Sequence, residues 1–153
     1  VGAVLLMPAG AALLGNLAPD GGPPASEFTP GLVGSAVNSD GRSASLTAPN
    51  GPAQQEVLLA AFLAAGRSPS ELCTAECHGT GTALGDPIEI GALARVRADC
   101  AEGWLPPVLA ASAKPLLGHA EAAAGALGLA RLLACCRLSA SCGAVASPGP
   151  HLR

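Results

Sequence analysis

Two of the three histidines lie in segments whose composition could support chemistry. His78 begins the run HGTGTALGDP, and His119 lies within SAKPLLGHAEAAAG. Each run follows a short apolar segment and precedes a helical pattern, so both imidazoles are expected just beyond the carboxyl ends of strands, where ligands meet α/β sheets. We therefore expect the two histidines to converge on one pocket.

Lys114 stands shortly before His119 and is the residue most able to influence it. Taken alone, Lys114 is typical of a solvated surface charge, His119 of a polar helix start, and His78 of a turn that caps a strand. Ser112 and Glu121 flank the pair and favour a supported site, in which a contact between Lys114 and Glu121 orients the loop. The following helix and Lys114 would keep His119 neutral, leaving one N–H to donate to an oxyanion.

Two other chemistries fit the histidine loops less well. A phosphate-binding loop needs the ending GK[ST], whereas this loop has Asp86 where the lysine would stand. A metal could in principle be held by Cys77, His78 and His119, but neighbouring residues at a strand end point to opposite faces. We therefore predict no metal site.

The apolar patterns that surround these loops alternate between strands and helices. Strands are predicted over 1–7, 32–37, 72–77 and 108–112, and helices over 52–65, from Asp86 onward, and over 120–136. Asp86 and Glu89 resemble a capping box, and Gly125 and Gly128 indicate close packing of the last helix. Residues 8–29 are predicted to form a surface excursion. This order predicts an α/β fold with a parallel or mixed sheet covered by helices.

Composition excludes several classes of function. Half of the 153 residues are hydrophobic, 12% are charged and the net charge is −3, so the chain can form a core and lacks the basic patch of a nucleic-acid-binding protein. Its apolar stretches are too short or too interrupted to cross a membrane. The six cysteines include no CxxC pair, which favours buried thiols in a reducing compartment.

Three blocks of the sequence resemble a known family. SAVNSDGRSASLTAPNGPAQ, ECHGTGTALGDPIEIGAL and SAKPLLGHAEAAAGALGLARLL are similar in order and spacing to signature blocks of the β-ketoacyl synthases, most of all the ketosynthase domains of type I polyketide synthases. The resemblance implies a thiolase-like layered α-β-α-β-α fold, mainly its second half and incomplete at both ends. Residues 1–30 would be the end of the N-terminal ketosynthase half with a divergent connection, and 31–153 a truncated C-terminal half.

The resemblance also implies a reaction: decarboxylative Claisen condensation of an acyl thioester with a malonyl unit on acyl carrier protein, in polyketide or fatty acid biosynthesis. By position, His78 and His119 resemble the two catalytic histidines and Lys114 the lysine that organises the second one, with Glu121 as its supporting partner. N–H donors aimed at the enolate oxygen formed by decarboxylation would stabilise it.

The same family implies how substrates arrive. Thr80 and Thr82 resemble the hydroxyls that hold the phosphopantetheine arm, so no cofactor is bound directly and the substrate comes on the phosphopantetheine of acyl carrier protein. A homodimer is implied for the intact domain, with no nucleic acid or membrane partner. The expected location is the cytoplasm, or a plastid if a transit peptide precedes the chain.

The family's nucleophilic cysteine has no match among the six cysteines. Cys135 and Cys136 are expected near a helix C-terminus, which opposes thiolate formation, and Cys73 and Cys77 within a strand. We therefore expect this chain alone to form no acyl adduct. The alternative function is a non-catalytic ketosynthase remnant that serves as a dimerisation or carrier-protein docking scaffold.

Overall fold

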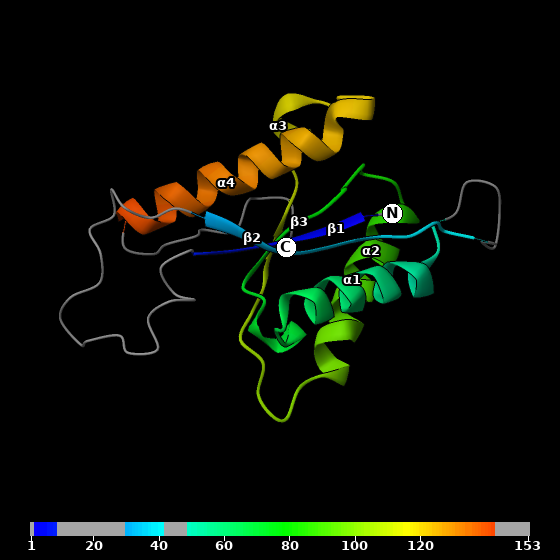
Figure 1. The fold of residues 1–153 in the computed structure, drawn as a ribbon. Helices are drawn as coiled ribbons and strands as arrows, with labels where there is room; N and C mark the ends of the chain where they lie inside the picture. The colour runs from blue at the N-terminus through cyan, green and yellow to red at the C-terminus, as the bar shows by residue number, and fades with distance from the viewer. Residues whose placement is uncertain (1, 9–29, 42–48, 143–153) are drawn as a thin grey trace.

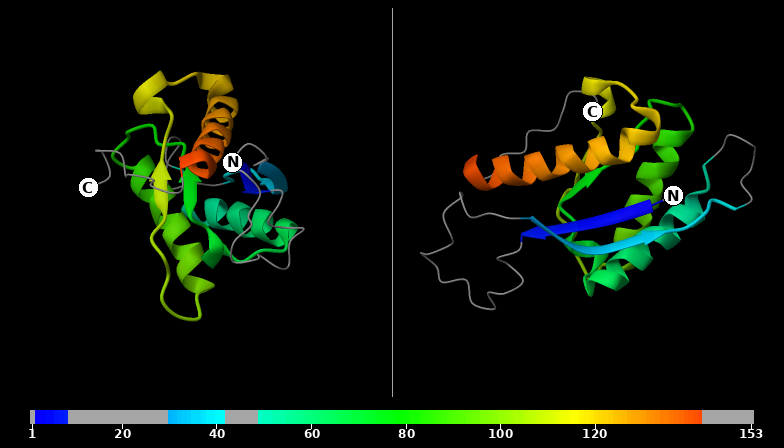
Figure 2. Two further views of the ribbon diagram at one scale, coloured as in Figure 1. Left: turned by 90° about the vertical axis from the view of Figure 1, so that its left-hand side faces the viewer. Right: turned by 45° about the horizontal axis from the view of Figure 1, so that its top comes forward.

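The computed structural model describes residues 2–8, 30–41 and 49–142. Most of the predicted excursion over 8–29 and the closing PGPHLR lie outside the described residues. Helices and strands alternate along the described chain as predicted. The strands lie between α4 (Ala124–Cys142) on one side and two helices, α1 (Gly51–Ala65) and α2 (Gly85–Asp99), on the other (Figures 1 and 2).

The described strands form two separate pairs rather than one continuous sheet. β1 (Gly2–Pro8) runs antiparallel to β2 (Pro30–Val37). β3 (Thr74–Glu76) runs parallel to β4 (Leu109–Ala111). The prediction of a single parallel or mixed sheet is therefore met only in part, because both strand types occur but no ladder joins the two pairs among the described residues.

Helix α1 supplies much of the core and has a clear cap at each end. The Asn50 side chain accepts from the Ala53 N–H at 3.2 Å, and Gly66 ends the helix in the left-handed conformation that the sequence predicted for it, with φ 62°. The buried residues of the core come mainly from α1 and α2: Ala53, Val57, Ala61, Phe62, Ala92, Leu93, Val96 and Ala113.

The capping box predicted for the start of α2 is wrong. The helix begins at Gly85 with Leu84 at its N-cap and no side-chain cap. Asp86 and Glu89 instead accept hydrogen bonds from the backbone of the loop that precedes the helix. The N–H groups of the loop have no other backbone partner and lie within hydrogen-bonding distance of these carboxylates. They take the place of the helix N–H groups that a capping box would have used.

The last long helix begins later than predicted. Residues 114–117 form a short helix, α3 (Lys114–Leu117), and a 3₁₀ turn, η3 (Glu121–Ala123), comes before α4. Gly118, at φ 77°, ends α3 and separates it from η3. A second 3₁₀ turn, η2 (Pro69–Glu71), follows α1.

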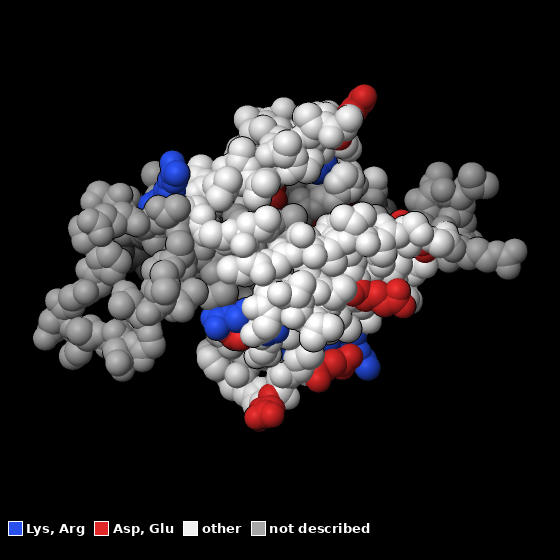
Figure 3. Space-filling model, in the orientation of Figure 1, with Lys and Arg blue, Asp and Glu red and all other residues white. Residues whose placement is uncertain are grey.

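Charged side chains are sparse on the face drawn in Figure 3, where lysine and arginine lie apart from one another. Several leucines and Trp104 are exposed, with Leu63 83% and Trp104 84% exposed. Within the described part of the chain, no helix is long and apolar enough to cross a membrane.

Strand β2 and helix α1 approach each other closely at Gly34. A Cβ atom on Gly34 would lie 2.4 Å from the Ala61 carbonyl oxygen and 2.9 Å from the Ala65 Cβ, so the strand lies against the helix backbone. We predict that Gly34→Ala lowers the free energy of unfolding by about 1–3 kcal/mol, because the added methyl forces the two elements apart.

Gly91→Ala, on helix α2, is the matched control. A Cβ atom at this position would have no neighbouring element within 4 Å. This substitution should raise the free energy of unfolding by up to about 1 kcal/mol through helix propensity alone. Urea denaturation of both variants measures the difference. Equal stability of Gly34→Ala and the unsubstituted chain would contradict the close approach.

Candidate functional site

The parallel pair of β3 and β4 determines where the site lies. Thr74, Ala75 and Glu76 pair with Leu109, Ala110 and Ala111. The ladder continues past β3, because the Cys77 N–H donates to the Ala111 carbonyl at 2.6 Å. Both strands therefore end at the same edge, and the two histidine-bearing segments leave it side by side, as the sequence predicted.

The main chain of His78 is held from the side of α2 by a carboxylate. Glu89 accepts from the His78 N–H at 2.5 Å with one oxygen and from the Gly79 N–H at 2.9 Å with the other. Asp86 accepts from the Gly81 N–H at 3.2 Å. These backbone donors have no ladder partner, so the two carboxylates fix a loop that would otherwise rely on water.

Gly79 allows the loop to follow this path. Its φ is 49°, and a Cβ atom would lie 2.7 Å from the Ser112 Cβ. A larger residue would be strained in this conformation and would also collide with the neighbouring segment. The loop carrying His78 is thus packed directly against the segment that carries Lys114.

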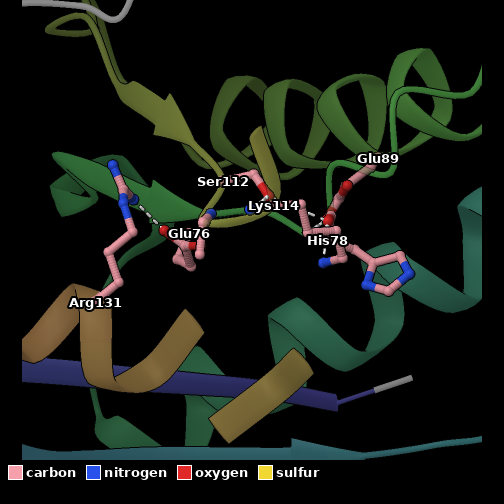
Figure 4. A network of polar contacts seen from close by, with 7 residues as sticks. Glu76, His78, Glu89, Ser112, Lys114 and Arg131 are labelled. Atoms are coloured by element: carbon pink, nitrogen blue, oxygen red, sulfur yellow. Dashed lines mark hydrogen bonds and ion pairs between the residues drawn. The ribbon is translucent and has the colours of Figure 1, made fainter. Parts of the chain in front are cut away.

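The carbonyl of His78 is held from the opposite side. The Lys114 ammonium donates to it, and the Ser112 hydroxyl donates at 3.3 Å (Figure 4). Lys114 is therefore paired with the first histidine loop and not with Glu121, contrary to the orienting contact that the sequence suggested. The reason is local: β4 delivers Lys114 beside the end of β3, whereas Glu121 lies beyond the turn at Gly118, in η3.

The tautomer of neutral His119 is set by a local hydrogen bond. The Glu121 N–H donates to His119 Nδ1 at 3.0 Å, in a turn where Glu121 has a φ of 45°. Because Nδ1 accepts, the proton of the neutral ring must lie on Nε2. Glu121 thus supports the imidazole through its main chain, and the Nε2–H is the donor that the oxyanion role of His119 requires.

The two imidazoles face each other. Their ring centroids are 5.5 Å apart and their planes cross at 83°, an edge-to-face arrangement. The two rings are thus close together, as the loops predicted, but only His78 lines the adjacent hollow and the expected shared pocket is met in part. Two ring N–H donors at this spacing can approach a single oxygen atom placed between them.

The surroundings of His78 favour its uncharged form. Burial lowers its pKa from the ordinary value of 6.5, and the nearby Lys114 ammonium lowers it further. His119 also lowers the pKa of His78, whereas the carboxylates of Glu89 and Asp86 raise it. At neutral pH the His78 imidazole is therefore neutral and has one N–H to donate.

Thr80 and Thr82 lie on the exposed loop beyond His78. Their hydroxyl oxygens are 3.4 Å apart, and Thr82 accepts from the Gly85 N–H at 3.0 Å. Both line an open hollow of about 1030 Å³, together with His78 and Lys114. The threonines are thus placed beside the histidine loop, within the same hollow.

A partly buried ion pair beside the site was not predicted from the sequence. Glu76, at the end of β3, pairs with Arg131 of α4 and accepts from the Ala113 N–H at 2.6 Å (Figure 4). One signal was present, because Arg131 is one of only two charged residues, with Arg137, in a mostly apolar helix, and Glu76 ends a short apolar run. Such charges are buried only when they are paired.

Cys77 and Cys136 are poor nucleophiles. Burial, followed by the charges of Glu89, Glu76 and Asp86, raises the pKa of Cys77 to about 12, and burial also raises the pKa of Cys136.

Over residues 2–8, 30–41 and 49–142, no three His, Cys, Asp or Glu side chains are grouped so as to hold a metal ion.

Comparison with known proteins identifies the family. Residues 31–140 match the family described as β-ketoacyl synthase, C-terminal domain. The chain is 45% identical over 123 residues to mycoketide-CoA synthase of Mycobacterium tuberculosis, an overlap that covers 79% of this chain and 3% of that protein. It is 54% identical over 93 residues to the polyketide synthase GfsA of Streptomyces halstedii, covering 60% of this chain and 1% of that protein.

Solved structures agree with the sequence comparison. A ketosynthase from module 6 of the bacillaene synthase of Bacillus subtilis 168 is 32% identical, with a TM-score of 0.59 over 69% of this chain and 19% of that one. The oxazolomycin ketosynthase domain OzmH KS8 of Streptomyces albus JA3453 is 30% identical, with a TM-score of 0.61 over 71% of this chain and 30% of that one. The chain therefore spans only a small part of its relatives, and it belongs to the β-ketoacyl synthase family as a segment of the C-terminal ketosynthase domain with the thiolase-like α/β fold.

Proposed function

We propose that this segment supplies the decarboxylation half of a ketosynthase site. The reaction is a decarboxylative Claisen condensation between an acyl thioester and a malonyl unit carried by acyl carrier protein. The observation that carries the proposal is the pair of neighbouring imidazoles, with ring centroids 5.5 Å apart and the Glu121 N–H donating to His119 Nδ1. Membership of the ketosynthase family supports it.

The histidines act on the malonyl thioester carbonyl. When the bond between the malonyl carboxylate and the α-carbon breaks, CO₂ leaves and the bonding electrons move onto the thioester oxygen as an enolate. The N–H groups of His78 and His119 hold that oxygen and stabilise the negative charge as it develops. The enolate carbon then attacks the acyl thioester carbonyl, and the thiolate that carried the acyl group departs.

Lys114, Thr80 and Thr82 assist this step without reacting. Lys114 fixes the main chain of His78 by donating to its carbonyl and, as a nearby cation, keeps the His78 imidazole neutral. The threonine hydroxyls beside the hollow hold the phosphopantetheine arm that delivers the malonyl group. The partners are an acyl carrier protein and, in the intact domain, a second copy of the ketosynthase.

Cys77 and Cys136 are poor candidates for the nucleophile that holds the acyl group. Cys77 stays protonated at neutral pH because of its raised pKa, and the pKa of Cys136 is shifted in the same direction. A thiol is a much weaker nucleophile than a thiolate. The scaffold alternative explains the family membership equally well but gives no use to a lysine-supported histidine pair.

The role of His119 can be measured in a chimera, in which residues 31–140 replace the matching segment of a solved ketosynthase. His119→Ala should lower the rate at which the malonyl carboxylate is lost by about 10²–10³-fold, because one enolate donor is removed. Mass spectrometry of the malonyl thioester follows the reaction.

Arg95→Gln is the control, because Arg95 pairs with Asp99 on the exposed side of α2. It should leave malonyl turnover unchanged. Unchanged turnover in His119→Ala as well would remove His119 from the proposed role and would favour the scaffold function.

Acylation of the chain itself gives a second prediction. Incubated with an acyl thioester at neutral pH, the 153-residue chain should show no stoichiometric mass increase, because no cysteine matches the family's nucleophile and the raised pKa keeps the Cys77 thiol protonated. Intact-protein mass spectrometry measures this, with a complete ketosynthase as the positive control. One acyl group per chain, mapped to any cysteine, would show that the nucleophile lies in this segment.

A further inference from the structure

We propose that Glu76 is a positioning residue whose carboxylate holds the His119 segment opposite His78. The carboxylate does not touch the reacting groups. It joins the three segments from which the site is built, and its consequence for catalysis rests on the proposed function. Its contacts, its burial and the glycine that lies against it all support this role.

Each carboxylate oxygen of Glu76 contacts a different segment. Oε1 accepts from the Ala113 N–H at 2.6 Å, directly before Lys114. Oε2 pairs with the Arg131 guanidinium on α4, the helix that follows the His119 turn. Glu76 itself ends β3, so a single side chain connects the strand leading to His78, the segment carrying Lys114 and the helix following His119 (Figure 4).

Both side chains of the pair are partly shielded from solvent. The Glu76 side chain is 11% exposed and that of Arg131 is 26% exposed, in contrast to 68% and 56% for the surface pair Arg95–Asp99. Surface pairs contribute little to stability, whereas removing one partner of a buried pair leaves an uncompensated charge. A shift of α4 along β3 would therefore separate the Arg131 guanidinium from the Glu76 carboxylate, which is the less exposed of the two.

Gly128 makes the contact possible. A Cβ atom on Gly128 would lie 3.1 Å from the Glu76 Cγ and 3.4 Å from its Oε1. Helix α4 can therefore lie this close to the carboxylate because residue 128 has no side chain. Gly125, on the same helix, has nothing within 4 Å of its Cβ position. Helix interiors disfavour glycine by about 1 kcal/mol relative to alanine. Close packing against Glu76 explains why α4 has a glycine at position 128 despite this loss of helix stability. Gly125 and Gly128 therefore provide a matched pair of substitution sites.

A purely structural ion pair would stabilise the fold without controlling the histidines, so the test must report on the distance between the rings. The charge of His119 lowers the pKa of His78, in surroundings where burial, Lys114, Glu89 and Asp86 also act. This influence depends on the spacing of the two rings. The change that His119→Ala causes in the titration of His78 is therefore a measure of that spacing.

The experiment is an NMR titration of the His78 imidazole in the full 153-residue chain. His119→Ala alone should raise the His78 midpoint, because a neighbouring positive charge has been removed. In a Gly128→Val background, which forces α4 away from Glu76 without changing any charge, His119→Ala should no longer change the midpoint. In a Gly125→Val background the full change should remain.

Glu76→Gln combined with Arg131→Gln gives a second test in case Gly128→Val does not fold, because it removes the ion pair and leaves no buried charge alone. It should also abolish the effect of His119→Ala. An undiminished effect in either folded variant would overturn the positioning role. The titration requires no turnover, so a failure of the proposed condensation in the chimera would leave this result standing, and the reverse also holds.

Discussion

The site depends on the parallel pairing of two strands of three residues each, Thr74–Glu76 and Leu109–Ala111. Their shared register brings His78 and Ser112 to one edge and allows the Lys114 ammonium to reach the His78 carbonyl. Parallel ladders are slightly less stable per residue than antiparallel ones, and strands this short provide few bonds. Hydrogen bonds from side chains must therefore supply the rest of the support for the two loops.

Carboxylates provide most of that support. Glu89 and Asp86 accept from the backbone of the histidine loop, while Glu76 connects β3 with Ala113 and Arg131. Hydrogen bonds to ionised acceptors are shorter and stronger than those between neutral groups. They hold the loop in conformations that include a left-handed Gly79 and leave the imidazole rings able to donate. The acids position the loop that carries His78, for which a catalytic role is proposed.

The sequence predicted the family, the alternation of strands and helices, and the convergence of His78 and His119, because short blocks with fixed spacing contain that information. It did not predict the partners of Lys114 and Glu89. Both were assigned to neighbours close in sequence, a Glu121 contact and a capping box, whereas the structure pairs them with backbone groups brought near by the β3–β4 ladder. Such long-range pairings depend on register, which the apolar pattern alone does not specify.

His78 and His119 are proposed to hold the same enolate oxygen. Malonyl decarboxylation by the chimera with His78→Ala, with His119→Ala and with both changes tests this most directly. Groups that act as one unit are strongly non-additive, so the double variant should lose about as much rate as either single variant. Losses that multiply would contradict the shared role, because they would show that the two imidazoles act independently.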